Sequence, residues 1–206
     1  MIERVVTSGT FSLDGQDFDV DNNIWLVGDD REVLVIDAAH DHLPIVEAIG
    51  SRRTVAIVAT HGHNDHINAA SALADRVEAP IWLHPADRQL WDQVYPSRPP
   101  DAELADGLGF DAGGSTLEVI HTPGHTPGGC SLHDRRLGVV FTGDTLFRGG
   151  PGATGRSFSD FPTIIESIRR RLLTLSPETR ALPGHGEETV IGDEAPHLDE
   201  WMARGH

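Results

Sequence analysis

A short apolar run that leads into a cluster of histidine and aspartate side chains restricts the fold of this sequence more than any other feature. Residues 55–59 read Val-Ala-Ile-Val-Ala, which is typical of a buried strand, and His61-Gly62-His63-Asn64-Asp65-His66 follows one residue later. In an extended segment, residues two apart point the same way, so His61 and His63 can face one ion together. Asp65 and His66 are adjacent and point apart, so the turn can present them to a second ion. Imidazole and carboxylate ligands together favour Zn²⁺, Mn²⁺ or Fe²⁺ over Ca²⁺.

Three further segments repeat the order of strand, glycine-containing turn and candidate ligand. They place His125 in a Thr-Pro-Gly-His-Thr turn, Asp144 in Thr-Gly-Asp, and His185 in Pro-Gly-His-Gly. Glycine and proline allow a turn to hold a side chain at the end of a strand. Each turn alone is a weak signal, but the four segments together predict a metal centre built from strand ends.

The pattern of apolar residues predicts a mixed α/β fold. We expect strands at 5–6, 24–27, 33–36, 55–59, 81–83, 117–120, 137–141 and 179–182, and helices at 44–49, 69–75, 86–94, 164–175 and 198–202. Residues 95–106 hold three prolines and read as a loop. No composition break divides the chain, so the prediction is one domain over residues 1–206.

Composition narrows the classes of partner. Lysine and arginine number 16 against 32 aspartates and glutamates, which gives a formal net charge of −16. Such a chain is a poor match for nucleic acid or for an anionic membrane surface, because both bind clustered cations. No signal peptide and no apolar run long enough for a bilayer is visible, so we expect a cytoplasmic protein. A single cysteine, Cys130, excludes a disulfide framework and a cysteine-rich zinc site.

The motif His-x-His-x-Asp-His, the later His125, Asp144 and His185, and the Val-Ile-Asp-Ala-Ala segment resemble the metallo-β-lactamase-fold superfamily. The segments TPGHTPG and GDTLF are most similar to its glyoxalase II-like (hydroxyacylglutathione hydrolase-like) branch. This resemblance implies a four-layer αββα sandwich with metals at one edge of the paired sheets. It also implies a ligand set in three parts: His61, His63 and His125 for a first ion, Asp65, His66 and His185 for a second, and Asp144 as the bridge.

The resemblance implies a metal-dependent hydrolase that cleaves a small thioester or related ester by attack of a metal-bound hydroxide. Asp65 and Asp144 are the predicted catalytic carboxylates, and the cofactors are two divalent ions, with zinc expected and iron or manganese as alternatives. Arg148 and Arg156 are candidate contacts for a substrate carboxylate, against the equal alternative of ordinary surface arginines. Asp37 matches the position of a carboxylate that orients a metal-bound histidine, and a simple turn aspartate is the alternative.

Two departures from the glyoxalase II pattern affect the substrate. Only residues 186–206 follow His185, so we expect the C-terminal helical domain that contacts glutathione to be missing. The turn after His125 reads Pro127-Gly128-Gly129, where many glyoxalase II sequences have a Gly-His pair. The expected partner is therefore a small-molecule thioester of unspecified thiol, with mycothiol as one option, and a homodimer is left open.

Other activities of the same superfamily are weighed against this hydrolase. A mononuclear non-haem iron persulfide dioxygenase, with iron on His61, His125 and Asp144, is the main alternative. Lactonases of this type use a tyrosine after the bridging aspartate, whereas the only tyrosine here is Tyr95. Many zinc β-lactamases have arginine in place of His66, and the charge of −16 disfavours RNA processing.

Overall fold

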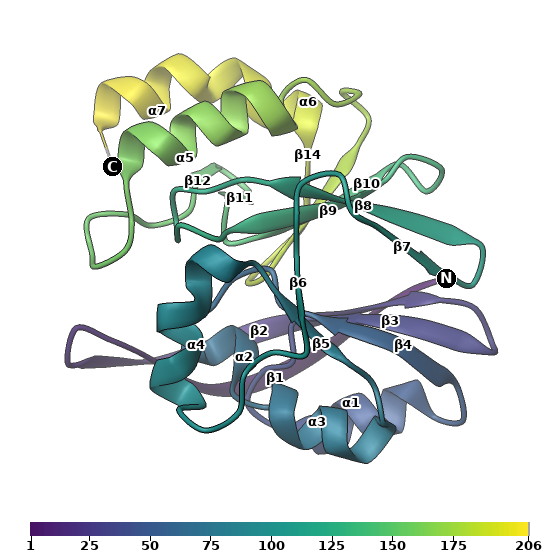
Figure 1. Cartoon of the computed structure of the whole chain (residues 1–206). Helices are drawn as coiled ribbons and strands as arrows, with labels where there is room; N and C mark the ends of the chain where they lie inside the picture. Colours follow the sequence, from purple (N-terminus) through teal and green to yellow (C-terminus); the bar gives the residue numbers. More distant parts are fainter. Residues whose placement is uncertain (206) are drawn as a thin grey trace.

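Two six-stranded sheets lie face to face and helices cover their outer faces, as the computed structural model of the chain shows (Figure 1). The structure describes residues 1–205. The first sheet has the order β1-β2-β3-β4-β5-β6, with bounds β1 (Ile2–Leu13), β2 (Gln16–Gly28), β3 (Glu32–Ile36), β4 (Arg53–Val58), β5 (Ile81–Leu83) and β6 (Ala102–Glu103). Strands β1 to β3 pair antiparallel, and β3 to β6 pair parallel.

The second sheet has the order β14-β13-β10-β9-β8-β7. Its strands are β7 (Gly109–Ala112), β8 (Ser115–His121), β9 (Cys130–Asp134), β10 (Val139–Gly143), β13 (Arg180–Pro183) and β14 (Thr189–Val190). Only β10 and β13 pair in parallel. A small hairpin of β11 (Leu146–Phe147) and β12 (Gly150–Pro151) extends from the end of β10.

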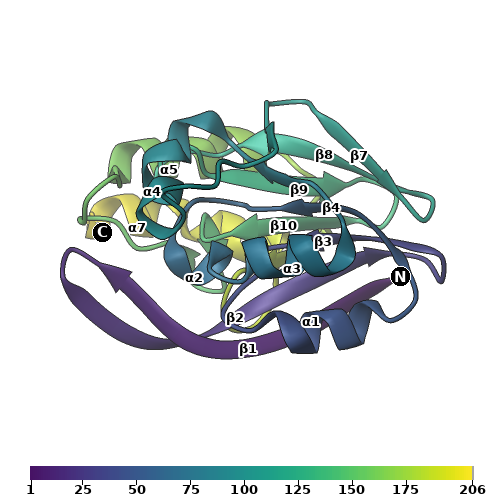
Figure 2. The ribbon, with the colours of Figure 1, turned by 60° about the horizontal axis from the view of Figure 1, so that its bottom comes forward.

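The helices divide between the two outer layers. Those on the first sheet are α1 (His42–Ile49), α2 (Asn64–Ile67), α3 (Ala70–Val77) and α4 (Arg88–Val94), with the 3₁₀ turn η1 (Pro85–Asp87) before α4. Those on the second sheet are α5 (Phe161–Ser167), α6 (Ile191–Glu194) and α7 (Leu198–Arg204), with the π-helical turn η2 (Ile168–Leu172) and the 3₁₀ turn η3 (Ala195–His197). Figure 2 shows α1 and α3 lying across the first sheet.

Three apolar cores separate the four layers, because strand residues alternate between the faces of a sheet. In β3, Val33 and Val35 pack toward the helices with Leu73, whereas Leu34 and Ile36 pack between the two sheets. The core between the sheets also contains Trp25, Val58, Phe110, Leu132 and Phe141. A third core joins Val140 and Ala181 of the second sheet to Ile164, Ile168 and Trp201. The predicted αββα sandwich is confirmed.

The predicted elements are present, and the structure adds others, among them the short strands β7, β11, β12 and β14. The first 28 residues form one long hairpin of β1 and β2 rather than separate short strands. Strand β9 was not predicted, and the predicted loop at 95–106 contains the short strand β6. The helix predicted at 164–175 begins earlier, at Phe161, and changes to π-helical turns after Ser167.

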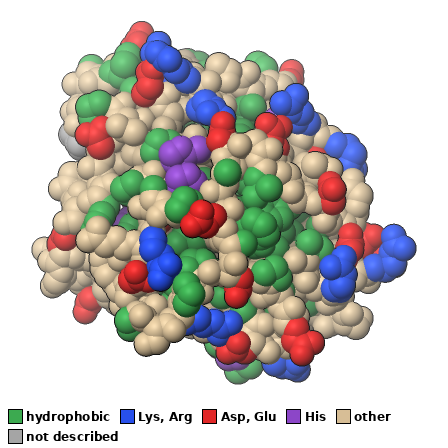
Figure 3. Space-filling model, in the orientation of Figure 1, with side chains coloured by type: hydrophobic (Ala, Val, Ile, Leu, Met, Phe, Trp, Pro, Cys, Tyr) green, Lys and Arg blue, Asp and Glu red, His purple; other side chains and the backbone are tan. Residues whose placement is uncertain are grey.

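Charged side chains of both signs are spread over the face of the molecule in Figure 3, with acidic and basic groups interspersed. No helix among residues 1–205 is both long and apolar enough to cross a membrane. On the face shown in Figure 3, the acidic residues do not gather into one patch but alternate with basic residues.

Candidate metal centre

The predicted ligands are brought to one edge of the paired sheets by the ends of strands. His61, His63, Asp65 and His66 follow β4, and His125 follows β8. Asp144 directly follows β10 and His185 follows β13, the parallel neighbour of β10. Because the carboxyl ends of these strands meet at the same edge, side chains from distant parts of the sequence converge there.

One glycine shows how closely the backbone must approach this centre. A Cβ atom on Gly184 would lie 2.5 Å from Cε1 of His66 and 2.6 Å from Oδ1 of Asp144. Real Cβ atoms do not make contacts this short, so a larger residue at 184 would push the two side chains away. The glycine of the Pro-Gly-His turn is therefore required by the site itself.

His61, His63 and His125 form the first group of candidate ligands. Nδ1 of His63 lies 3.1 Å from Nε2 of His61 and 3.0 Å from Nε2 of His125. His61 and His63 are buried, and the rings of the three histidines lie edge to face. Three ring nitrogens thus point to one common position.

Asp65, His66 and His185 form the second group. Nε2 of His185 lies 3.1 Å from Nε2 of His66 and 3.2 Å from Oδ2 of Asp65. Asp65 and His66 come from the short helix α2, which begins within the His-rich motif. The sequence pattern alone suggested a turn here, and the helix is what directs these two adjacent side chains to the same position.

Asp144 lies between the two groups. Its Oδ2 atom is 3.5 Å from Nε2 of His125 in the first group and 3.4 Å from Nε2 of His185 in the second. Its Oδ1 atom is 3.4 Å from Nε2 of His66. A carboxylate in this position can contact ions held by both groups.

The residues fit divalent ions. Two imidazole nitrogens on one tetrahedral zinc ion lie about 3.3 Å apart when each Zn–N distance is about 2.0–2.1 Å. The nitrogen pairs of both groups have nearly this separation, at 3.0–3.1 Å. In addition, Oδ1 of Asp65 and Oδ1 of Asp144 are buried without a hydrogen-bond partner, and such atoms are costly unless a ligand satisfies them.

The free ring nitrogens of two ligands are fixed by backbone carbonyls. Nδ1 of His125 donates to the carbonyl of Ala153 at 2.8 Å, and Nδ1 of His185 donates to the carbonyl of Asp21 at 2.7 Å. With a proton on Nδ1, each ring is oriented so that its Nε2 atom points into the centre. Hydrogen bonds of this kind commonly set the tautomer of metal-binding histidines.

The electrostatic environment differs between the two groups. Burial lowers the pKa of His63 to about 3, and burial with the neighbouring His66 holds the pKa of His61 well below its usual value. Burial also opposes the charged form of His185, but Asp144 and Asp65 outweigh it and raise its pKa to about 10. His61 and His63 of the first group are thus neutral imidazoles, while His185 of the second group is cationic.

Carboxylates of the centre remain ionised beside these cations. Burial opposes the charged form of Asp144, but His66 and His185 outweigh it and hold its pKa well below the usual value. In the same way, His66 and His185 lower the pKa of Asp65 against its burial. For His66, burial is outweighed by Asp144, Asp65 and Asp37, so its pKa is well above the usual value.

Asp37 lies directly behind the second group. Its Oδ2 atom is 2.9 Å from Nδ1 of His66, and its Oδ1 atom accepts the backbone N–H of Thr60 at 2.7 Å. The Thr60 hydroxyl donates to Oδ2 at 2.9 Å. Asp37 has a left-handed backbone with φ of 57°, which turns its side chain back toward the metal centre.

Asn22 is a contact of the site that the sequence analysis missed. Its Nδ2 atom donates to Oδ2 of Asp65 at 3.1 Å, and its Oδ1 atom lies 2.8 Å from Nε2 of His40. The other ring nitrogen of His40 lies 3.2 Å from Nδ2 of Asn68. The only sequence signal was the polar Asp21-Asn22-Asn23 segment at the start of an apolar run.

The two candidate substrate arginines lie in different surroundings. Arg156 is stacked over the ring of Phe18 at 4.8 Å and donates to Oε1 of Gln16 at 2.9 Å, so it contacts the β1–β2 hairpin. Arg148 instead lines a surface pocket together with Glu194 and His197. Two aromatic rings flank the ligands themselves, because Phe11 lies 5.2 Å from His63 and Phe147 lies 6.4 Å from His185.

Curated relatives cover most of the chain. An uncharacterized protein of Aquifex aeolicus is 32% identical over 94% of this chain and 94% of its own length. A protein of Haemophilus influenzae named hydroxyacylglutathione hydrolase GloC is 33% identical, over 83% of this chain and 87% of its own length.

Solved structures also align with nearly the whole fold. The B3 metallo-beta-lactamase BLEG-1 matches with a TM-score of 0.80 and 27% identity, over 95% of this chain and 99% of its own. TTHA1623 in a di-iron-bound form matches with a TM-score of 0.75 and 31% identity, over 85% of this chain and 93% of its own. ETHE1 from Myxococcus xanthus matches with a TM-score of 0.75 and 26% identity, over 96% of this chain and 85% of its own.

The family model that describes the metallo-beta-lactamase superfamily matches residues 18–185, from strand β2 to the last of the histidines in the centre. The matched range therefore includes all seven candidate ligands and the strands β4, β8, β10 and β13 that they follow. The chain is a member of the metallo-beta-lactamase superfamily.

Proposed function

We propose that this protein is a cytoplasmic dinuclear metal-dependent hydrolase that cleaves a small thioester or related ester. The observation that supports this proposal best is the presence of two adjacent groups of ligand atoms with Asp144 in contact with both. A hydrolase with a single ion would not need the second group, whose three side chains converge as closely as those of the first. The similarity to hydroxyacylglutathione hydrolase GloC supports a thioester as the substrate.

In this proposal His61, His63 and His125 would hold one ion, Asp65, His66 and His185 the other, and Asp144 would bridge them. Divalent ions supply Lewis-acid polarisation of the substrate carbonyl and a water molecule acidic enough to attack it at neutral pH. Zinc is the expected metal, and the di-iron form of TTHA1623 makes iron a serious alternative.

The side chains of this protein would orient the reactants. The buried Oδ1 atoms of Asp65 and Asp144 lack hydrogen-bond partners, so each can accept a hydrogen bond from the attacking water. The rings of Phe11 and Phe147 beside His63 and His185 would exclude water from the substrate. Arg156, at the β1–β2 hairpin, is our first candidate contact for a substrate carboxylate, and Arg148 is the second.

The first test is elemental analysis of protein purified without added metal or chelator, followed by a panel of acyl thioesters of glutathione and mycothiol. We expect close to two ions per chain and turnover of at least one thioester. Asp144→Ala should abolish turnover, whereas Asp134→Asn, a change at a buried aspartate of β9, should not. Full activity of Asp144→Ala would overturn the mechanism.

The second candidate is a mononuclear iron persulfide dioxygenase, with iron on His61, His125 and Asp144. The similarity to ETHE1 from Myxococcus xanthus keeps this candidate in view. An oxygen electrode distinguishes the two functions. One iron per chain, no zinc and oxygen uptake with a persulfide would replace the hydrolase by the dioxygenase, and refusal of both substrate classes would contradict both.

A further inference from the structure

A buried carboxylate outside the seven candidate ligands joins the two turns that hold the first group. Asp87 is completely buried at the end of η1, just before α4. Its Oδ2 atom accepts the backbone N–H of Gly62 at 2.8 Å and the hydroxyl of Thr126 at 2.7 Å. Its Oδ1 atom accepts the backbone N–H of Gly128 at 2.5 Å.

These three donors belong to the turns that present the first group. Gly62 lies between His61 and His63, and Thr126 directly follows His125. Asp87 is 25 residues from Gly62 and 39 residues from Thr126 in the sequence, so it links two distant segments, which the backbone hydrogen bond from Cys130 to Thr60 also joins. One side chain thus holds both turns through hydrogen bonds.

Two glycines make room for this carboxylate. A Cβ atom on Gly128 would lie 2.7 Å from Cγ of Asp87. A Cβ atom on Gly62 would lie 3.0 Å from the backbone carbonyl oxygen of Asp87 and 2.9 Å from Cβ of Leu90. Larger residues at either position would therefore displace Asp87 or the turn. The two glycines beside the predicted ligands are explained by the carboxylate packed against them.

The chemistry of the contacts requires an acceptor at this position. Both backbone partners of Asp87 are N–H groups, and neither can accept a hydrogen bond at its nitrogen. A carboxylate satisfies both with its two oxygens. An amide of the same shape would direct its NH₂ group toward one of these donors and would leave that N–H without a partner.

We propose that Asp87 is a positioning residue for the first metal ion, because it fixes the His61–His63 turn against the His125 turn. The second group does not depend on it, since Asp65, His66 and His185 are supported by Asn22, Asp37 and the carbonyl of Asp21. The inference rests on the metal centre of the proposed function, but not on the identity of its substrate.

Zinc affinity measured in two backgrounds tests this proposal without using enzyme activity. His185→Ala leaves the first group complete, and His125→Ala leaves the second complete. In the His185→Ala background, Asp87→Asn should raise the zinc dissociation constant about 10–100-fold, the usual effect of losing a partner behind metal ligands. In the His125→Ala background, Asp87→Asn should leave zinc affinity unchanged. Competition with a chromophoric chelator gives both constants.

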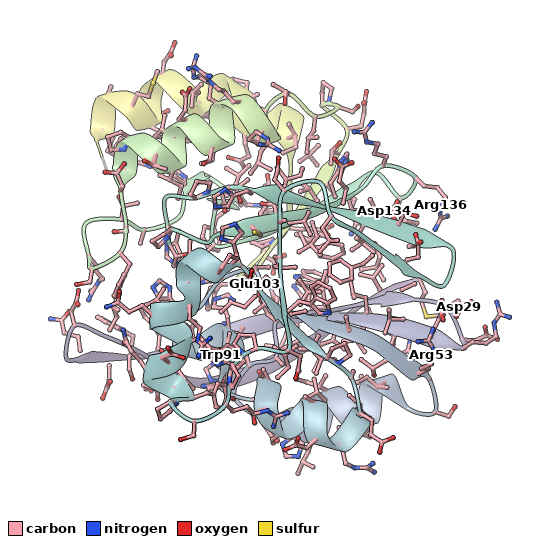
Figure 4. The ribbon with its side chains drawn as sticks, viewed as in Figure 1. Asp29, Arg53, Trp91, Glu103, Asp134 and Arg136 are labelled. Carbon is pink, nitrogen blue, oxygen red and sulfur yellow. The ribbon has the colours of Figure 1, made fainter. Side chains whose placement is uncertain are left out.

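Asp134→Asn is the matched control, because Asp134 is also buried but lies at the end of β9, on the opposite side of the view from Trp91 of α4 (Figure 4). This control should change zinc affinity in neither background. The proposal would be overturned if Asp87→Asn weakened zinc binding equally in both backgrounds, or if it weakened zinc binding in neither.

A milder variant covers the case in which Asp87→Asn does not fold. Thr126→Val removes one of the three donors to Asp87 and keeps the shape of the side chain. It should weaken zinc binding several-fold in the His185→Ala background only, and an unchanged constant there would contradict the proposal. If the wild-type protein binds two zinc ions but hydrolyses no thioester, the proposed function fails and the role of Asp87 still stands.

Discussion

Nδ1 of His66 lies 2.9 Å from Oδ2 of Asp37, and both side chains are buried. Since Asp37 is an acceptor, it holds a proton on Nδ1 of His66, and Nε2, which faces Asp65, Asp144 and His185, is the nitrogen that must lose its proton to bind an ion. The Asp37 carboxylate therefore selects the one neutral tautomer of His66 in which this nitrogen can bind an ion.

Asp37→Asn should reverse this selection. Asparagine tolerates the left-handed backbone at this position, so the fold should persist. Its NH₂ group can donate to Nδ1 of His66 and would move the histidine proton to Nε2, which then points into the centre. We expect zinc affinity of the second group to fall about 10–100-fold, as measured by chelator competition in the His125→Ala background. Unchanged affinity would show that Asp37 acts only as a turn residue.

When zinc binds, the second group of the metal-free protein should release more protons than the first. His185, with a pKa of about 10, and His66, whose pKa is well above its usual value, are both protonated at pH 7 and must lose their protons to bind an ion. His63, with a pKa of about 3, and His61, with a strongly lowered pKa, are already neutral.

Affinity of the second group should therefore rise with pH between 7 and 9, while affinity of the first should change little. Isothermal titration calorimetry in buffers of different ionisation enthalpy counts the protons. We expect about two protons per zinc in the His125→Ala background, because two histidines exchange a proton for the ion. Far fewer should be released in the His185→Ala background, and equal release from both groups would contradict the assignment of charge.

The layered fold could be predicted because its central strands are continuous apolar runs. The run at 55–59 and the run at 33–36 are buried on both faces, and such strands need helices on one side and a second sheet on the other. Strand β1 could not be recognised in full, because most of its residues are exposed or half-buried and form no apolar run. Strand β9 was hidden by its buried polar residues Ser131, His133 and Asp134.

The candidate ligands could be predicted because the decisive ones are local. His61 to His66 stand within six residues, and the later ligands follow strands and glycines. Their supporting partners could not be predicted, because these depend on how distant segments pack. Asn22 is 43 residues from Asp65, and Asp87 is 41 residues from Gly128. In the sequence, Asn22 and Asp87 look like ordinary polar residues next to apolar segments. Their role becomes visible only when the partner from the distant segment is known.

Cys130 should not react with thiol reagents in the native protein. Burial, together with the nearby carboxylates of Asp87 and Asp106, raises the pKa of its thiol far above neutrality, so the reactive thiolate is absent. A chromogenic disulfide reagent should detect no thiol in the folded protein and one thiol per chain after denaturation. Cys130→Ser should retain metal content and turnover, and rapid labelling of the native protein would contradict this prediction.

Arg156 should affect substrate affinity more than Arg148 does. Its guanidinium group lies over Phe18, and the neighbouring Ser157 donates its backbone N–H to Asp14 at 3.1 Å, so this loop is attached to the tip of the β1–β2 hairpin. Arg156→Ala removes a stacking contact worth about 0.5–1 kcal/mol at an exposed site and frees the hairpin tip.

The expected result for Arg156→Ala is a KM raised several-fold with kcat and metal content unchanged. The reason is that the side chain of Arg156 contacts Gln16 and Phe18, which are not among the seven candidate ligands. Phe18→Leu should raise KM in the same direction, since it removes the ring beneath the guanidinium group. Arg148→Ala is the matched control and should leave KM unchanged, because Arg148 lines a different pocket with Glu194 and His197. Steady-state kinetics on the thioester that turns over fastest distinguishes the two arginines. A raised KM for Arg148→Ala alone would place the substrate carboxylate at Arg148, in the turn between β11 and β12, and would contradict the prediction.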